Sequence, residues 1–472
     1  MNDCLRVNAT KGHNFCSTRS SKRSALALVT IASLIFTIYL ADRLWSAPAH
    51  TYLVKLNSQP LFGVNHNKVC LPLFDDLIAK NSAHVEDMYP NNNEGELGKW
   101  VTVTSKEDIT SELTADTYDV AVVEDGSTVV RIPELGNYIR PNDNVRNDKT
   151  WGLRLPKIKE GRDILVPLRK VVVAVVDTGI DIKHPALKDS LVKGRNFAGG
   201  DPEDVSNRNK NESHSTHVSG TIIAKPGADG FYGIAYGYAV VMPVRVLDES
   251  GSGTWESVSR GIIYATDTGA NVINMSLGGG YSEAMRDACK YAKGKGVVIV
   301  CAKGNSGNDR PQYPGSFPEV IGVNATALKT DGNEERAIFS SYGENSTCSA
   351  PGHFIYSTLP GGKYGFYSGT SMACPHAAGC SALILCQEKL TPDQIKSIMQ
   401  TRGDTLQTDK PIGLRINLPK FLKNKDARVD LRKPEYRRDH NWRYNRNTSE
   451  WYTYRDTHHY NSAQRRIFQP LP

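Results

Sequence analysis

The stretch VVVAVVD, residues 171–177, decides the fold of this 472-residue chain. Six consecutive apolar residues, five of them valine, are typical of a strand that is covered on both faces, as in a parallel sheet. Further runs of this kind follow, most of them separated by helical stretches: Val240–Val246, Ala270–Met275, Gly296–Cys301 and Glu319–Val323. The sequence therefore predicts an α/β fold over residues 151–422, built on a doubly wound parallel sheet.

Polar side chains follow two of the predicted strands. Asp177 ends the first strand, and Asn305 comes shortly after the strand that ends at Cys301. Sheets of this type bind and react at the carboxyl ends of their strands. A carboxylate there can orient a base and an amide can donate to an oxyanion, although either residue alone is also common in turns.

The segment GTSMACPH, residues 369–376, predicts a glycine turn that delivers Ser371 to the start of a buried helix. The positive end of the helix dipole and its unpaired N–H groups favour a nucleophile at this place. Taken alone, the pattern is more typical of a helix cap, so the interpretation depends on the residues upstream.

A second helix begins in SHSTHVSGT, residues 213–221, with His214 near its start. His214 and His217 have a spacing that zinc sites also use, but no carboxylate or cysteine partner is apparent nearby in the sequence. Asp177, His214 and Ser371 instead follow one another in the order of the subtilisin triad.

Six motifs extend this agreement beyond the three residues. They are VVVAVVDTGID, HSTHVSGT, VINMSLGG, AKGNSG, YPGSFPEVIGV and SGTSMACPHAAG. On their order and approximate spacing, residues 150–422 resemble the subtilisin-like serine proteases, the subtilases or peptidase family S8. An α/β-hydrolase does not fit, because Ser371 is not in G-x-S-x-G and the triad order differs.

The resemblance implies a serine endopeptidase that hydrolyses peptide bonds through an acyl-enzyme intermediate. It makes Ser371 the nucleophile, His214 the general base and Asp177 the group that orients the imidazole. Asn305 and the Ser371 N–H would bind the oxyanion. A catalytically inactive subtilase kept as a binding module is the alternative, which a serine-directed probe would separate.

The resemblance also implies a polypeptide substrate bound mainly through its backbone. Two segments resemble the edges that pair with it, and two further residues match the pocket for the fourth residue before the cleaved bond. These residues are Gly251, Ser252 and Gly253 on one side, Ser276, Leu277 and Gly278 on the other, and Trp255 and Val258 in the pocket. We expect an apolar side chain in that pocket.

Three positions depart from the family's usual pattern. Ser215 replaces a glycine after the catalytic histidine, and we expect activity to survive this change. Lys303 replaces a small residue, so it either influences the primary specificity pocket or extends outward. Gln312 stands at the floor of that pocket and predicts a shortened pocket.

The family's usual calcium site is not supported, because Ala186 stands where an aspartate is expected. Asp201, Glu203 and Asp204 offer another acidic cluster, but a solvated loop explains them better. The metal and cofactor therefore stay unassigned, and calcium is the candidate to test.

The N-terminal region predicts targeting to the secretory pathway. Residues 1–23 form a basic head and residues 24–41 form an apolar run. The run fits either the core of a signal peptide or a type II signal anchor, which would hold the protein on a membrane with its head in the cytosol.

Residues 50–140 predict a compact α+β module, with strands near both ends and a hairpin formed by residues 118–123 and 127–132. Its position and pattern resemble the family's propeptide, which implies a folding aid and inhibitor that is removed autocatalytically. We expect the cut between about Ile132 and Lys149. Residues 141–150 are then a linker.

The tail, residues 423–472, is basic and aromatic with few aliphatic residues, which predicts an extension that is disordered or loosely docked. The net charge of +7 lies largely in the head and this tail, so we expect no nucleic-acid partner. Of nine cysteines, Cys289 and Cys301 are a candidate pair, and three others read as core residues: Cys374, Cys380 and Cys386. Glycosylation sequons occur at Asn211, Asn324, Asn345 and Asn447, and also at Asn274 in a predicted buried strand.

Overall fold

A computed structural model describes residues 50–57, 80, 83–89, 96–113, 120–132, 148–207, 213–422, 442–445 and 450–453. The predicted head and apolar run, residues 1–41, lie outside these ranges. Within them, no helix combines the length and apolarity needed to cross a membrane.

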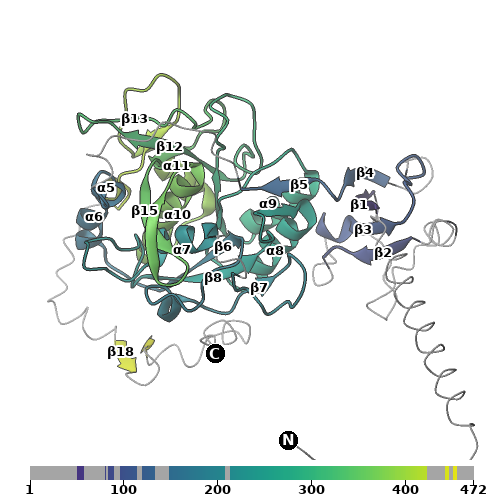
Figure 1. The fold of residues 1–472 in the computed structure, drawn as a ribbon, viewed down its shortest axis with the longest axis horizontal. Helices are drawn as coiled ribbons and strands as arrows, with labels where there is room; N and C mark the ends of the chain where they lie inside the picture. The colour runs from purple at the N-terminus through teal and green to yellow at the C-terminus, as the bar shows by residue number, and fades with distance from the viewer. Residues whose placement is uncertain are drawn as a thin grey trace, which may run out of the picture.

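A nine-stranded sheet lies at the centre of the described chain, in the order β17-β14-β12-β11-β10-β6-β8-β7, with β13 attached to β12 (Figure 1). Its strands are β6 (Val171–Asp177), β7 (Arg195–Asn196), β8 (Ala239–Arg245), β10 (Val272–Met275), β11 (Val298–Ala302), β12 (Ile321–Leu328), β13 (Glu334–Arg336), β14 (Cys348–Pro351) and β17 (Leu414–Arg415). All pairs are parallel except β12 with β13. The strand order reverses at β6, which is where such sheets place their sites.

Helices cover both faces of the sheet, as the uninterrupted valine run predicted. Val171, Val173 and Val175 pack in one buried cluster with α7 (His214–Ile223) and α10 (Thr370–Gln387). The alternate residues of β6 pack in a second cluster with α8 (Trp255–Asp267) and α9 (Glu283–Gly294). The predicted doubly wound α/β fold is therefore confirmed.

Smaller elements complete the main domain. They are α5 (Trp151–Arg154), α6 (Ile158–Ile164), the 3₁₀ helix η2 (Lys188–Ser190), β9 (Ser252–Thr254), the hairpin of β15 (Ile355–Leu359) and β16 (Lys363–Tyr367), α11 (Pro392–Thr401) and α12 (Leu418–Phe421).

The N-terminal unit contains a separate antiparallel sheet in the order β2-β3-β1-β4. Its elements are β1 (His50–Leu56), β2 (His84–Asp87), the 3₁₀ helix η1 (Leu97–Lys99), β3 (Trp100–Ser105) and β4 (Val120–Asp125). Tyr52, Val54 and Val103 build a small core of its own, whereas Leu53 and Trp100 belong to the cluster of α8 and α9. Figure 1 shows the unit on that side of the domain.

The predicted hairpin of residues 118–123 and 127–132 is wrong. β4 pairs with β1, but β5 (Val129–Arg131) leaves the sheet and pairs with β9 of the main domain. Strand propensity identified both segments, but their partners depend on contacts far away in the sequence.

The structure corrects three smaller expectations. Cys289 and Cys301 are free, buried thiols, not a disulfide. Asn324 is fully buried, with its amide donating to the Ser341 carbonyl, so the folded chain offers no glycan acceptor there. Within the tail, β18 (Trp442–Asn445) and β19 (Glu450–Thr453) pair as a hairpin, although we expected a disordered or loosely docked extension.

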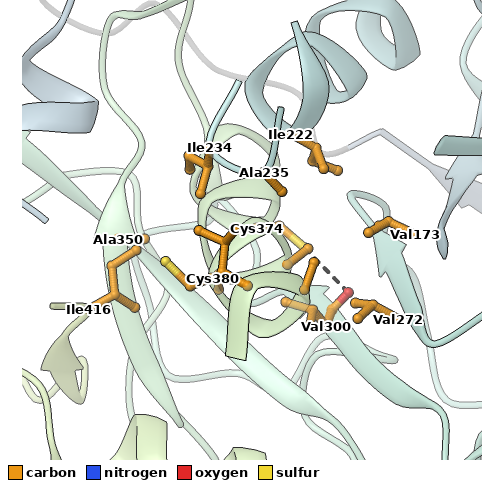
Figure 2. Packing of buried hydrophobic residues seen from close by; sticks show 14 of the residues in the cluster. Val173, Ile222, Ile234, Ala235, Val272, Val300, Ala350, Cys374, Cys380 and Ile416 are labelled. Carbon is orange, nitrogen blue, oxygen red and sulfur yellow. Dashed lines mark hydrogen bonds between the residues drawn. The ribbon is translucent and has the colours of Figure 1, made fainter. Parts of the chain in front are cut away.

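The cysteines of α10 lie in the core, as predicted. Figure 2 shows Cys374 and Cys380 among aliphatic side chains from several elements, with the Cys374 thiol donating to the Val300 carbonyl at 3.3 Å. Burial raises the pKa of both thiols far above their ordinary value. They are packing residues and not reactive groups.

Candidate active site

Asp177 and His214 meet at the carboxyl edge of the sheet. Asp177 ends β6, is fully buried, and accepts a hydrogen bond from the Thr178 N–H at 2.7 Å. His214, in the first turn of α7, donates from Nδ1 to this carboxylate, with Nδ1 lying 2.8 Å from Oδ1 and 3.1 Å from Oδ2. An imidazole that donates through Nδ1 carries its basic lone pair on Nε2.

Ser371 lies in the first turn of α10, two residues after Gly369, whose φ of +148° suits glycine. Its hydroxyl donates to the Ser276 carbonyl at 3.1 Å. Pro375, four residues on, has no N–H, so the Ser371 carbonyl lacks its helical donor. The Ser276 hydroxyl supplies that bond at 2.9 Å. Ser276 thus bonds both the hydroxyl and the carbonyl of Ser371. Pro375 in the helix could have indicated this role, because it leaves the Ser371 carbonyl in need of another donor.

Asn305 follows β11 and lies against the start of α10. Its side-chain oxygen accepts from the Thr370 N–H at 2.9 Å and from the Thr370 hydroxyl at 2.8 Å. Its Nδ2 is turned toward Gly369, where an added Cβ would lie 3.3 Å from it. The structure therefore fixes an amide donor beside the turn that carries Ser371, and Thr370 is a positioning residue that the sequence analysis missed.

The two predicted substrate edges enclose a strand of the chain itself. β5 pairs antiparallel with β9 on one side, and the Ile132 N–H donates to the Gly251 carbonyl at 3.1 Å. On the other side, Arg131 exchanges two backbone hydrogen bonds with Gly278, at 3.1 and 3.0 Å.

Val130 is buried close to the residues predicted to line the pocket for the fourth substrate residue, Trp255 and Val258. All three side chains are buried in one cluster, together with Leu277. Val130 precedes Arg131, so its side chain points to the opposite face of the strand and enters the domain.

Lys303 and Gln312, two of the three residues that depart from the family's usual pattern, both make contacts near Asn305. Lys303 does not extend outward: it is 4% exposed, and its ammonium donates to the Ser316 hydroxyl at 2.7 Å and the Glu344 carbonyl at 2.6 Å. Gln312 donates to the Ser306 hydroxyl at 2.9 Å, and its oxygen lies 2.0 Å from where a Cβ on Gly304 would be. It therefore covers Gly304 at close range.

Ser215 is fully buried in α7, and its N–H donates to the Thr178 hydroxyl at 3.3 Å. Its own hydroxyl has no hydrogen-bond partner among the described residues. The backbone here is helical, so the serine needs no conformation reserved for glycine.

The candidate metal ligands are engaged in other contacts. Asp201 accepts from the Glu203 N–H at 2.9 Å, and Glu203 pairs with Lys193 at 2.6 Å. His217 donates from Nε2 to the Ile355 carbonyl at 2.9 Å, and burial lowers its pKa to about 3. Over the part of the chain that is described, no group of three or more histidine, cysteine, aspartate or glutamate side chains could hold a metal ion.

Comparison with known proteins decides the family. The profile of the subtilase family, peptidase family S8, matches residues 169–415. The chain belongs to the subtilase family. It is 37% identical to thermitase of Thermoactinomyces vulgaris over 268 residues, which are 56% of this chain and 92% of thermitase. It is 39% identical to subtilisin DY of Bacillus licheniformis over 242 residues, which are 50% and 84% of the two chains.

A solved structure extends the similarity in space. Fervidolysin of Fervidobacterium pennivorans, described as a keratinolytic enzyme related to subtilisin, superposes with a TM-score of 0.64 at 26% identity. The match covers 81% of this chain and 62% of fervidolysin. On these relationships, this subtilase is a subtilisin-like serine endopeptidase, and its substrates are polypeptides.

Proposed function

We propose that Asp177, His214 and Ser371 form the catalytic triad of this subtilase. His214 would take the proton of the Ser371 hydroxyl on Nε2 while the serine oxygen attacks the substrate carbonyl carbon. The imidazolium would then give that proton to the leaving amine as the peptide bond breaks. Water would hydrolyse the resulting acyl-enzyme by the same route. Asp177 stabilises the charged imidazole through the Nδ1 hydrogen bond.

Asn305 and the Ser371 N–H would bind the oxyanion. Thr370 fixes the amide of Asn305 through its oxygen, so the Nδ2 donor is oriented before the substrate arrives. A donor that needs no reorganisation stabilises the developing charge more strongly than a mobile one.

We further propose that the enzyme is made as a zymogen, with the N-terminal unit of residues 50–132 as its inhibitor. The observation that carries this proposal is β5, whose backbone pairs with both predicted substrate edges while Val130 is buried in one cluster with Trp255 and Val258. A substrate would use the same backbone partners, so the two compete. Glu124 adds a contact by accepting from the Ser282 hydroxyl at 2.7 Å at the start of α9, where a carboxylate is favoured.

The register of β5 indicates where processing occurs. Arg131 lies opposite Gly278, and Ser276, which holds Ser371, is two residues before Gly278. In an antiparallel pair, moving forward two residues on one strand corresponds to moving back two residues on the other. A chain that continues in this register past Ile132 therefore comes opposite Ser276, and so close to Ser371, within a residue or two. We therefore expect the cut near the start of the interval between Ile132 and Lys149.

The position of Gln312 suggests the primary specificity. Gln312 stands at the floor position of the pocket and covers Gly304, so we propose a shallow pocket that prefers small or short side chains at the cleaved residue. We retain the secretory pathway as the proposed destination on the basis of residues 1–41.

Self-processing tests these proposals together. The chain from His50 onward would be expressed as wild type and as Ser371→Ala, and the N-termini of the products would be sequenced. We expect the wild type alone to lose the N-terminal unit. An intact wild type that also fails to react with a serine-directed fluorophosphonate probe would favour the inactive binding module. An intact chain that does react would refute the zymogen proposal only.

A further inference from the structure

A buried carboxylate on α9 holds the N-terminal unit at a place away from the cleft. Asp287 lies on α9, which packs against the face of the sheet opposite to α10 and Ser371. Its side chain is 1% exposed. An ionised carboxylate at such burial is strongly destabilising unless hydrogen bonds and opposite charges compensate it.

The compensation comes mostly from the N-terminal unit. Lys55 of β1 donates to Oδ2 of Asp287 at 2.7 Å, and the indole N–H of Trp100 donates to the same oxygen at 3.2 Å. Among the described residues, the catalytic domain itself supplies one donor, Lys290, at 2.9 Å from Oδ1. The two donors of the unit belong to adjacent strands, so a folded unit presents them together.

The surrounding groups support a charged contact. Burial acts to lower the pKa of Lys55, but its hydrogen bonds with Asp287 and Glu96 outweigh that effect and raise the pKa. Glu96 lies 2.9 Å from the Lys55 ammonium and also pairs with Lys99 at 2.8 Å. Trp100 is fully buried between the unit and α9, and the Lys55 ammonium lies 5.7 Å from the centre of its ring.

We infer that Asp287 is a recognition site outside the cleft, by which the catalytic domain retains its own N-terminal unit. It recognises the unit by accepting hydrogen bonds from a lysine ammonium and an indole N–H at the same time. This inference rests on the proposal that the unit inhibits the enzyme. The cleft contacts of β5 are backbone pairs that any extended segment can make. Asp287 selects a partner that carries Lys55 and Trp100 in this arrangement, and it remains in contact after the chain is cut near Ile132.

The first experiment needs no cleavage. In the chain from His50 with Ser371→Ala, Asp287→Asn keeps the shape of the side chain and removes its charge, and Asp163→Asn is the control, since Asp163 pairs with Lys159 on the surface. We expect hydrogen exchange of residues 50–56 and 100–105 to rise at least about 10-fold in Asp287→Asn, with exchange in β6 and α10 unchanged. Unchanged exchange in residues 50–56 and 100–105 would overturn the inference.

A variant in the N-terminal unit shows whether the effect of Asp287→Asn comes from a local defect of α9. Lys55→Met should raise exchange in the same strands, and the double variant should add little to either single change, because one contact is removed in all three. Full additivity of the two changes would also overturn the inference.

The second experiment uses the active chain. After processing, activity should appear as the cut unit dissociates on dilution, and the rate constant of this release should be at least about 30-fold larger in Asp287→Asn. An equal rate constant in wild type and variant would count against Asp287. If the wild type is never cut, the zymogen proposal fails, while the exchange experiment still decides the role of Asp287.

Discussion

The buried lysine at the end of β11 gives a prediction with a defined sign. Lys303 is 4% exposed, two residues before Asn305, and its ammonium joins the Ser316 hydroxyl and the Glu344 carbonyl. Burial lowers the pKa of Lys303 from its ordinary value of 10.5 to about 8, and the nearby Glu344 carboxylate opposes this shift only partly. A shift of this size corresponds to about 3 kcal/mol, and we take about 2 kcal/mol after allowing for solvent screening.

The sign follows from proton binding in the two states. The unfolded chain holds the Lys303 proton up to about pH 10.5, whereas the folded chain releases it near pH 8. The folded state therefore binds fewer protons between these values, and the free energy of unfolding rises with pH across that window. Below pH 8 Lys303 is protonated in the folded chain, so the full cost of burying its charge lowers the free energy of unfolding.

The test compares the pH dependence of stability in two proteins. Lys303→Met would be made in the Ser371→Ala chain from His50, which prevents self-cleavage, and urea unfolding would be followed at pH 7.5 and pH 10. We expect the parent to gain about 2 kcal/mol from Lys303 over this range and the methionine variant to lack that gain.

Lys329→Met is the matched control, because Lys329 is exposed and makes only a long pair with Asp331, at 3.6 Å. The control should keep the rise of the parent. If the free energy of unfolding rises equally with pH in Lys303→Met and in the parent, the reasoning that Lys303 is buried at the cost of desolvating its charge is refuted.

Other outcomes follow from the site. Ser371→Ala should lower turnover by about 10⁶-fold in peptide hydrolysis, the scale known for a subtilase triad, and normal turnover would remove it from the triad. Asn305→Ala should lower kcat by about 10²- to 10³-fold with KM little changed; a loss confined to KM would contradict an oxyanion role. Gln312→Gly should raise the kcat/KM ratio of phenylalanine over alanine at the cleaved residue by roughly 10-fold or more in matched peptides, and an unchanged ratio would place the side chain outside the pocket. Ser215→Ala should raise the free energy of unfolding by about 1 kcal/mol in urea titrations, because it removes a buried hydroxyl without a described partner, and a loss of stability would mean that the hydroxyl is satisfied.

The sequence alone indicated the subtilase family and the candidate triad. The valine-rich run of residues 171–177 is typical of a strand buried on both faces, and Asp177 at its end then lies at the reactive edge of a parallel sheet. The order of Asp177, His214 and Ser371 along the chain completed the assignment, because these signals are local or depend on sequence order alone. Strand positions in the N-terminal unit were also recognisable from alternation.

Only the tertiary structure decided which segments became partners. The segments β4 and β5 have similar strand propensity, but β5 pairs with β9 because both sides of the cleft offer it backbone hydrogen bonds and Val130 is buried with Trp255 and Val258. The sequence left open whether Lys303 influences the pocket or extends outward. The fold buries it, because Ser316 and Glu344 come from segments that meet only in the folded chain. Asp287 gave no signal at all in the sequence. An acidic residue on a helix is ordinarily solvated, and its burial depends on Lys55 and Trp100, which lie more than 180 residues away. Local pattern fixes what a segment can form, whereas long-range packing and charge pairing decide what it contacts.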